Sequence, residues 1–387
     1  MSKNSIPAVR FCDFSDNWES KKIGDLGSVS MNKRIFKDET SETGEVPFYK
    51  IGTFGSEPDS FITREKFEEY KSKYPYPEIG DILISASGSI GRTVEYQGEE
   101  AYFQDSNIVW LKHDERLNNS FLKQFYSIVK WEGIEGTTIK RLYNKNILET
   151  PISLPSPDEQ SAIGSLFRTL DELLTSYKDN LVNYQSLKAT MLSKMFPKAG
   201  QSVPEIRLDG FKGEWEKTTL EKSTERIKSY SLSRDVETSQ DTGLKYIHYG
   251  DIHLGKVSLI DDGNSIPYIK SDTKMNEFLQ QGDLIFADAS EDYKGIAEVA
   301  VMAITLSEKI VAGLHTIAVR PYSILDSIFL YYMFKTQTFR KYGYKVGTGM
   351  KVFGISPSNL MKYEFFYPDK KEQQAIGSYF SNLDNLI

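Results

Sequence analysis

The sequence contains few of the residues from which many functional sites are built. Cys12 is the only cysteine among 387 residues, which excludes a disulfide within the chain and a zinc site built on several cysteines. The four histidines, His113, His248, His253 and His315, show no metal-ligand spacing. We therefore expect no metal site, and the cysteine content favours a cytoplasmic protein.

Long apolar runs and common catalytic motifs are also missing. No stretch reaches the roughly 18 apolar residues of a membrane span, and the first residues lack the apolar region of a secretion signal. There is no Gly-x-x-x-x-Gly-Lys-Ser/Thr phosphate loop, and no Asn-Pro-Pro-Tyr or Asp-Pro-Pro-Tyr segment of an amino-methyltransferase. Gly88-Ser89-Ile90-Gly91 lacks dinucleotide-site spacing and is read as a tight turn. We expect no membrane association and no catalytic residue.

Net charge limits the classes of partner. The formal charge is −7, which argues against a nucleic-acid binder that acts alone. Any DNA-binding role must therefore depend on local positive charge or on a basic partner.

The chain repeats itself. Pro7, Arg10, Phe14 and Trp18 recur in order as Pro204, Arg207, Phe211 and Trp215. The segment 80–83, Gly-Asp-Ile-Leu, recurs as 282–285, Gly-Asp-Leu-Ile, and 159–171 recurs as 372–384 with most residues retained. The separation between copies grows slowly along the chain, as small insertions in the second copy would produce. Chance matches would not keep one order, so we infer two homologous halves.

Each copy opens with mixed, mostly β sequence. Residues 46–51, 82–85 and 107–111 are short β-rich runs bounded by Gly, Pro or Asp. Apolar residues at helical spacing follow from about Ser120 to Lys130. These patterns predict an α+β fold with two similar lobes of mixed, mostly β structure.

A long helix is predicted to follow the first lobe. Ser156, Pro157 and Glu159 form a capping-box pattern at its start. Apolar residues then alternate at steps of four and three, as in a coiled coil. This seam comprises Ile163, Phe167, Leu170, Leu174, Tyr177, Leu181, Tyr184, Met191 and Met195. The predicted rod is roughly 58 Å long.

The seam needs a partner, because a single helix with a narrow apolar face is marginal in water. The second copy starts a matching helix at Asp369, with Glu372 three residues later, but the sequence ends at Ile387. We expect the two helices to pair. The predicted domains are a first lobe at 1–155, a spacer helix at 156–197, a second lobe at 198–368, and a truncated second helix at 369–387.

Two basic, aromatic stretches occupy equivalent places in the copies. Residues 327–363 contain no acid, and Lys335, Arg340, Lys341, Lys345, Lys351 and Lys362 alternate there with Tyr331, Tyr332, Tyr342 and Tyr344. Residues 136–148 repeat the pattern more weakly. Such segments suit contacts to DNA phosphates, although a solvated surface helix and loop would look similar.

Polar loops after the two Gly-Asp segments are the second candidates for DNA contact, because their side chains can pair with base edges. The framing residues agree between the copies and the loop residues differ, as two readers of different DNA words require. The combined candidates are Ser85, Ser87, Ser89, Arg92, Lys140, Arg141, Asn144, Lys145, Asp288, Ser290, Glu291, Lys294, Lys345, Thr348 and Lys351.

Over essentially its whole length the chain resembles the specificity subunit of Type I restriction–modification systems. The resemblance lies in Trp18 and Trp215, the two Gly-Asp segments, and residues 157–163 with the long helix, echoed at 369–376. It implies two target-recognition domains, which read a split asymmetric site in double-stranded DNA, and two helical regions that pair antiparallel as a ruler. The predicted rod corresponds to about 17 base pairs as an upper bound. The short second helix departs from the family pattern.

The resemblance also implies partners. Modification subunits would methylate adenine at N6 with S-adenosylmethionine as the methyl donor. Restriction subunits would add translocation along DNA and DNA cleavage, with ATP and Mg bound to them. This chain itself would bind no cofactor. Two alternatives stay open at this point: a coiled-coil scaffold that does not bind DNA, and a catalytic DNA enzyme with an unrecognised active site.

Overall fold

The chain folds into two compact units, which are described separately. A computed structural model describes residues 7–136, 140–270, 274–290, 296–349 and 353–387. Unit 1 comprises Met1–Ser176 and unit 2 comprises Tyr177–Ile387. The division falls inside the helix α4, Pro157–Lys194, and the boundaries predicted at residues 155, 197 and 368 stay predictions.

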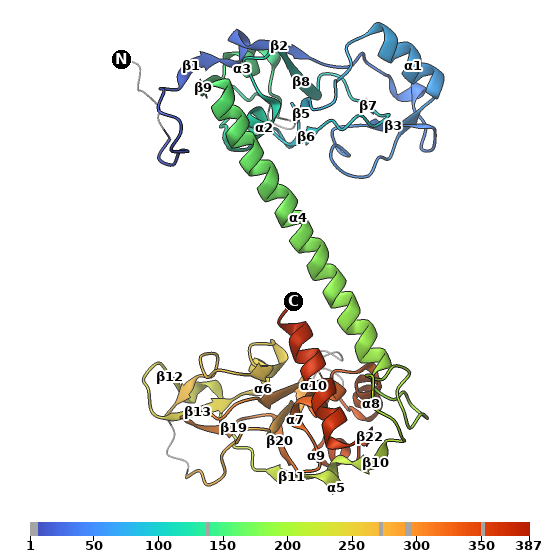
Figure 1. The fold of residues 1–387 in the computed structure, drawn as a ribbon, viewed down its shortest axis with the longest axis vertical. Coiled ribbons are helices and arrows are strands. Elements are labelled where there is room, and N and C mark those ends of the chain that lie inside the picture. The colour runs from blue at the N-terminus through green and yellow to red at the C-terminus, as the bar shows by residue number, and fades with distance from the viewer. Residues whose placement is uncertain (1–6, 137–139, 271–273, 291–295, 350–352) are drawn as a thin grey trace. The chain divides into compact units, whose positions relative to one another are not determined.

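The described residues of unit 1 form three sheets (Figure 1). The central one has the order β2-β8-β5-β6, the second has the order β4-β3-β7, and β1 pairs with β9. The strands are β1 Glu19–Lys22, β2 Gly27–Ser30, β3 Val46–Tyr49, β4 Phe61–Ile62, β5 Ile82–Ser85, β6 Thr93–Glu95, β7 Tyr102–Phe103, β8 Ile108–His113 and β9 Pro151–Leu154. The three strands predicted from the sequence are confirmed as β3, β5 and β8.

Unit 2 repeats this arrangement with additions. Its central sheet has the order β11-β20-β16-β18-β14, the second has the order β12-β15-β13-β19, β10 pairs with β22, and β17 pairs with β21. The strands are β10 Glu216–Thr219, β11 Thr224–Ile227, β12 Glu237–Thr238, β13 Leu244–Ile247, β14 Leu259–Ile260, β15 Tyr268–Ile269, β16 Leu284–Ala287, β17 Ala289–Ser290, β18 Val299–Met302, β19 Lys309–Ala312, β20 Thr316–Pro321, β21 Phe353–Gly354 and β22 Glu364–Tyr367. The predicted duplication is therefore present in the strand order.

The helices also correspond between the units. Unit 1 holds α1 Arg64–Lys73, α2 Asn119–Ile128, α3 Asn144–Glu149 and the start of α4. Unit 2 holds α5 Leu220–Ser223, α6 Tyr249–His253, α7 Ser327–Phe334, α8 Gln337–Val346, α9 Pro357–Met361 and α10 Lys370–Asp384. By position α2, α3 and α4 match α7, α9 and α10, whereas α8 lies in the part of the second copy where residues are inserted. Within the described ranges, no helix is both long and apolar enough to cross a membrane.

The two Gly-Asp segments form the same turn at the start of a central strand. Gly80 and Gly282 have φ angles of +92° and +93°, which glycine adopts without strain. The carboxylates of Asp81 and Asp283 accept hydrogen bonds from the backbone N–H groups of Glu78 and Gln280, at 2.8 and 2.7 Å. The repeated sequence thus fixes strand entry and leaves the loop after the strand free to vary.

A buried carboxylate anchors the start of α4. Ser156 caps the helix by accepting from the Glu159 N–H at 3.3 Å. The second contact of the predicted capping box, from the Glu159 side chain back to the start of the helix, is nevertheless wrong. The Glu159 side chain instead binds the N-terminal arm, the segment before β1 that contains Arg10 and Trp18. Arg10 donates to both of its oxygens at 2.6 and 2.7 Å, and the Trp18 indole donates at 3.1 Å. A guanidinium fork satisfies a buried carboxylate better than one backbone N–H does, and it holds the pKa of Glu159 below its ordinary value.

The same anchor recurs at α10. Asp369 caps that helix by accepting from the N–H groups of Lys371 and Glu372, as predicted. Arg207 donates to both oxygens of Glu372 at 2.6 Å, and the Glu372 side chain is fully buried. The next residue, Gln373, binds the backbone of Asp326 at the start of α7 at 2.7 Å. Each long helix is therefore fixed to the sheet domain by an equivalent Glu-Gln pair.

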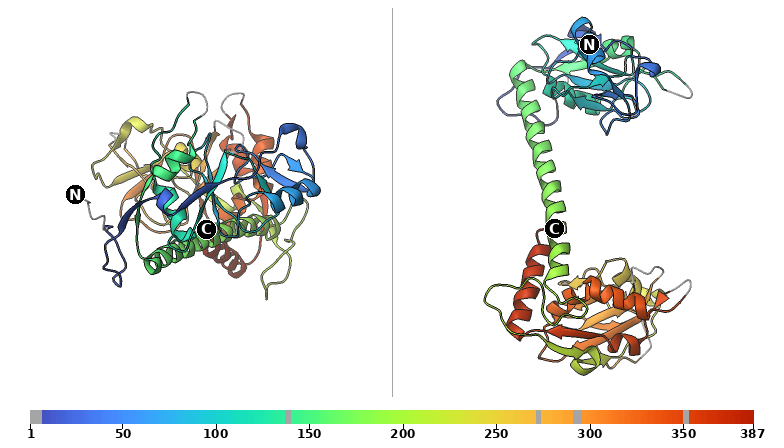
Figure 2. Two further views of the ribbon diagram at one scale, coloured as in Figure 1. Left: turned by 90° about the horizontal axis from the view of Figure 1, so that it is seen from above. Right: turned by 90° about the vertical axis from the view of Figure 1, so that its right-hand side faces the viewer.

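Within unit 2, α10 lies antiparallel to the last turns of α4 (Figures 1 and 2). The rings of Phe196 and Phe380 stack with centroids 6.0 Å apart, and Lys188 forms an ion pair with Asp384. Leu383 is buried on the same face. The predicted pairing of the two helices therefore exists for the segment that the short α10 can cover.

The rest of the predicted seam divides by exposure. Met195 is buried, and Ile163, Tyr184 and Met191 are partly buried. The remaining seam residues are exposed, and they are Phe167, Leu170, Leu174, Tyr177 and Leu181. The apolar pattern seen in the sequence thus lies along solvent-facing positions of α4 between its two anchored ends.

Replacing Glu372 by Ala is expected to lower the free energy of unfolding of unit 2 by about 3 kcal/mol, because the Arg207 guanidinium would lose its buried partner. Urea unfolding followed by circular dichroism measures this change. Glu364→Ala is the matched control, since Glu364 pairs with Lys217 at the surface, where both side chains are more than half exposed. Equal losses in the two variants would contradict the anchoring role.

Candidate nucleic-acid interface

In unit 1 the two predicted DNA-contact segments lie side by side. The loop after β5 approaches the basic segment before α3, so that the Gly88 N–H donates to the Lys140 carbonyl at 3.1 Å. The Leu142 N–H donates to the Ala86 carbonyl at 2.8 Å, and Ser87 and Arg141 form an isolated β-bridge. Segments more than fifty residues apart thus share one surface.

The equivalent segments of unit 2 meet in the same way. After β16, the short strand β17 pairs with β21, which matches Ala289 with Gly354 and Ser290 with Phe353. The Ile355 N–H donates to the Asp288 carbonyl at 2.8 Å. The backbone frame of the two candidate surfaces is therefore repeated, although the side chains differ.

Two of the predicted contact residues serve the loop itself. Ser85 and Ser87 are 1% and 3% exposed. The Ser85 hydroxyl donates to the Ser89 carbonyl at 2.5 Å and accepts from the Arg92 N–H at 2.9 Å, while the Ser87 hydroxyl donates to Asn107 at 2.6 Å. Because these hydroxyls are buried and satisfied, the prediction that they face DNA needs correction: they shape the loop.

The other unit 1 candidates are exposed. They lie in the two joined segments or directly after them: Ser89, Arg92, Lys140, Arg141, Asn144 and Lys145. The Arg92 guanidinium also donates to the Phe54 carbonyl at 2.8 Å, which ties a neighbouring loop to this surface. Three cations and two neutral polar groups therefore remain open to solvent beside Arg92, a composition suited to phosphate and base contacts.

In unit 2 an acid and a histidine occupy the corresponding surface. Asp288 lies 3.1 Å from the His315 ring, measured between Oδ1 and Nδ1. Burial raises the pKa of Asp288, and the neighbouring His315 counteracts this. Ser290 is buried, with its hydroxyl 3.5 Å from the His253 ring, so it needs the same correction as Ser85. The predicted residues Glu291, Lys294 and Lys351 lie outside the described residues.

The basic stretch of unit 2 is less basic at the surface than its sequence indicates. Glu298 lies between Lys335, at 2.9 Å, and Arg340. Burial alone would raise the pKa of Glu298, but the two cations hold it below its ordinary value. Two of the six predicted cations are thus paired with one acid that is distant in sequence, which offsets one of their two charges. Lys345 and Thr348 are exposed.

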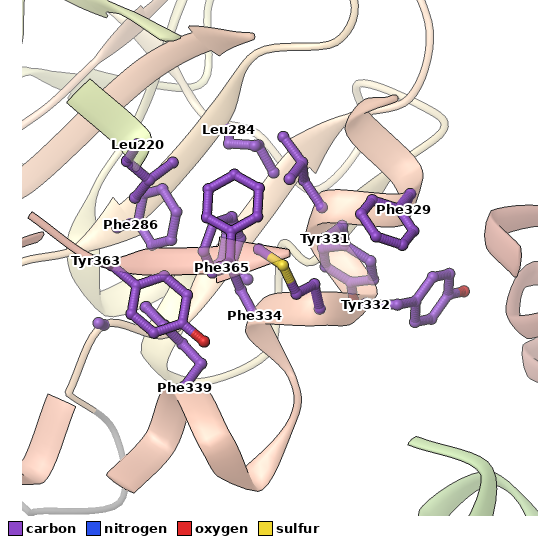
Figure 3. Close-up of a cluster of buried hydrophobic side chains, with 14 of the residues drawn as sticks. Leu220, Leu284, Phe286, Phe329, Tyr331, Tyr332, Phe334, Phe339, Tyr363 and Phe365 are labelled. Carbon is purple, nitrogen blue, oxygen red and sulfur yellow. The ribbon is translucent and has the colours of Figure 1, made fainter. Parts of the chain in front are cut away.

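The tyrosines of that stretch are also divided. Tyr331 and Tyr332 belong to the buried apolar cluster of unit 2, on the same helix as Phe329 (Figure 3). Their exposed fractions are 5% and 0%. Burial raises the pKa of both phenols. They are core residues, so the aromatic side chains available for DNA in this segment are fewer than predicted.

Sequence reasoning missed Asn107 and His315 as members of the two surfaces. Each lies at a sharp bend before a central strand, where Ser106 in unit 1 and His315 in unit 2 have φ angles of +53° and +55°. Such left-handed backbone is uncommon outside glycine and often marks a functional loop. No residue pattern in the sequence predicts this left-handed backbone, because Ser and His have no preference for it as strong as that of glycine.

The described residues contain no group of three or more His, Cys, Asp or Glu side chains placed to hold a metal ion. The surfaces offer exposed cations, amides and one acid–histidine pair. Their chemistry suits reversible binding to a polyanion with polar base edges.

Comparisons with known proteins agree on one family. The model of the Type I restriction modification DNA specificity domain matches residues 15–184 and 214–387. A putative type I restriction enzyme specificity subunit of Haemophilus influenzae is 53% identical over 161 residues, which is 41% of this chain and 42% of that protein. The match therefore spans less than half of that relative.

Solved structures show the same fold. The Type I restriction–modification S subunit of M. genitalium superposes with a TM-score of 0.55 at 17% identity, covering 95% of this chain and 90% of that one. A chain from a study of complex assembly and conformational transition of the type I R–M system gives 0.50 at 15% identity, covering 95% and 90%.

Two copies of the specificity domain, matched over nearly the whole sequence, agree with the duplicated sheets and the paired candidate surfaces. Subunits of this kind recognise DNA sequence and are not themselves catalytic. The chain belongs to the specificity subunits of Type I restriction–modification systems.

Proposed function

We propose that this chain reads a bipartite, asymmetric site in double-stranded DNA, one half with each unit, and that it presents that site to modification subunits that methylate adenine at N6. One observation carries the proposal. In both units the loop after the Gly-Asp strand is hydrogen-bonded to a segment later in the chain, the one before α3 in unit 1 and the one before α9 in unit 2. The backbone arrangement is therefore shared, whereas the side chains that it displays differ.

Different side chains on the same backbone arrangement imply that the two units recognise different half-site sequences. Unit 1 presents Arg92, Lys140 and Arg141, and arginine pairs well with the major-groove edge of guanine. Unit 2 presents Asp288 beside His315, and an acid accepts from the amino group of cytosine. Two unlike surfaces would read two unlike half-sites, which makes the whole site asymmetric.

The helix α4 would set the distance between the half-sites. It runs without interruption over 38 residues, Pro157–Lys194, about 57 Å at the usual rise. Its two ends are fixed by different contacts, Glu159 with Arg10 at the start and Phe196 with Phe329 and Phe380 beyond the end. A continuous helix with both ends anchored can serve as a ruler.

Partner subunits would supply what this chain does not carry. The net charge of −7 opposes DNA binding unless basic surface comes from elsewhere, and modification subunits are the proposed source. S-adenosylmethionine would bind to those subunits, and ATP and Mg would bind to restriction subunits in the full complex. Because these partners act on cellular DNA, we place the protein in the cytoplasm.

Methylome sequencing of a host that expresses this chain with its modification subunits tests the proposal. The expected result is methyl-adenine within one two-part motif whose halves differ. A motif that is continuous, or no motif that depends on this chain, would overturn it. Exchanging the loop after β5 with one from another specificity subunit should change one half of the motif only.

Replacing Lys140 and Arg141 together by Ala is expected to weaken DNA binding by the assembled complex and to lower the slope of log K against log salt concentration by about 2, because two phosphate contacts would be lost. Fluorescence anisotropy over a salt series measures both effects. Lys71→Ala with Lys73→Ala, on α1, removes the same charge outside the two loops and should leave the slope unchanged.

Inserting four helix-forming residues after Tyr177 is expected to change the preferred gap between half-sites without changing either half, because the helix lengthens by about 6 Å, roughly two base pairs. Methylome sequencing gives the new spacing. Four residues inserted after Gly200, an exposed loop position with nothing near its Cβ, are the control. A change in half-site sequence would show that α4 is not a ruler.

A further inference from the structure

Unit 2 has a basic groove on one side of α8. It lies where α8 meets the segment after α4 and the paired strands β10 and β22 (Figure 1), and its volume is about 750 Å³. The charged residues that line it are five lysines and one glutamate: Lys198, Lys217, Lys341, Lys345, Lys362 and Glu364. All six are exposed. The groove therefore presents a local excess of positive charge on a chain whose net charge is −7.

Most of this positive charge has no acidic partner. Lys217 pairs with Glu364 at 2.9 Å, and Lys198 also has an acidic partner. Among the described residues, the other three lysines of the groove form no ion pair. Two of them, Lys341 and Lys345, lie four residues apart on α8, so that they share one helix face about 6 Å apart and repel each other. Neighbouring cations without acids suit an anionic ligand that contacts several of them.

The repeat indicates that the fold does not require these lysines. Lys362, at the end of α9, corresponds to Glu149 at the end of α3. The residues that follow them, Tyr363 and Thr150, accept equivalent backbone hydrogen bonds from the segments after β10 and β1, at 3.2 and 3.0 Å. The helix α8 lies in the part of the second copy where residues are inserted. One backbone arrangement thus carries opposite charges in the two units, so the lysines serve a role specific to unit 2.

The groove adjoins the candidate DNA-contact surface of unit 2. Lys345 lies in the last turn of α8. Three residues later, Thr348 exchanges backbone hydrogen bonds with Gly354 at 3.0 and 2.8 Å. Gly354 belongs to β21, which pairs with β17 in the loop after β16. The lysines of α8 therefore continue the surface formed by that loop.

The type of cation in the groove favours phosphate groups as the ligand. Lysine is depleted at protein–protein interfaces, and it binds phosphates as a flexible point charge. Each DNA strand presents one phosphate charge per 3.4 Å of the helix axis. Lysines spaced about 6 Å apart on one helix face can therefore contact separate phosphates of one strand.

We propose that this lysine groove binds the DNA backbone next to the bases that unit 2 reads. The contact would add affinity without changing the recognised sequence, because phosphates carry no base identity. It would also be one-sided, since unit 1 has an acid at the position of Lys362. This inference rests on the proposed DNA-reading function.

Replacing Lys341 and Lys362 together by Ala is expected to weaken DNA binding by the assembled complex roughly tenfold at low salt and to lower the slope of log K against log salt concentration by about 2. Fluorescence anisotropy over a salt series measures both effects. Lys212→Ala with Lys222→Ala is the matched control, because both are exposed lysines of unit 2 outside the groove, and it should change neither quantity. Circular dichroism checks that both variants are folded.

Two further measurements locate the contact. Methylome sequencing should return the same two-part motif for the variant with Lys341→Ala and Lys362→Ala, since no base contact is lost. DNA with single neutral methylphosphonate linkages next to the half-site of unit 2 should bind the unmodified complex more weakly and leave binding by this variant unchanged. A changed motif, or equal effects of these linkages on both complexes, would overturn the inference.

The failure of this inference differs from that of the proposed function. Unchanged affinity and salt slope in a variant that still yields the motif would overturn the groove's role and leave DNA reading intact. A chain on which no motif depends would overturn both. Loss of modification subunits from the variant complex without DNA, followed by sedimentation, would identify a protein surface as the ligand and would also overturn the inference.

Discussion

The structure depends on a carboxylate removed from water at the first turn of each long helix. Glu159 and Glu372 are almost completely buried, and a buried unpaired carboxylate would be very costly. Arg10 and Arg207 therefore have to reach them, which fixes the arm at the start of each copy. The following glutamines tie the helices to α2 and α7. Arm, sheet domain and helix are thus held in one register within each unit.

This anchoring lies in the part of each sheet domain that is the same in both copies, and the loops that differ between the copies lie outside it. The Gly-Asp turn and the Glu-Arg pair define how each sheet domain is built, and they are the same in both copies. The loops that follow the central strands β5 and β16 extend from this conserved part of the fold. They contain Arg92 in one copy and Asp288 in the other. Changes in those loops leave the anchor untouched, so new DNA preferences can arise without loss of the fold.

The sequence predicted the elements whose patterns are local. The strand Ile82–Ser85, the helix α2 and the 38-residue α4 follow from runs, caps and spacing. Errors arose where a distant residue decided the outcome. Glu159 binds Arg10, which is 149 residues away in the sequence. Glu298 pairs with both Lys335 and Arg340, and the Ser87 hydroxyl donates to Asn107. Periodicity and composition contain no information on such pairings, because they depend on the folded topology.

The uneven support of α4 has a consequence for handling the protein. Between Leu170 and Val182 every residue is exposed, so this stretch is held mainly by its own backbone hydrogen bonds. Isolated helical segments of that length are marginal in water, and their termini here are secured only by the lobes at either end. Limited proteolysis would therefore cut first in the middle of α4 and release two intact lobes.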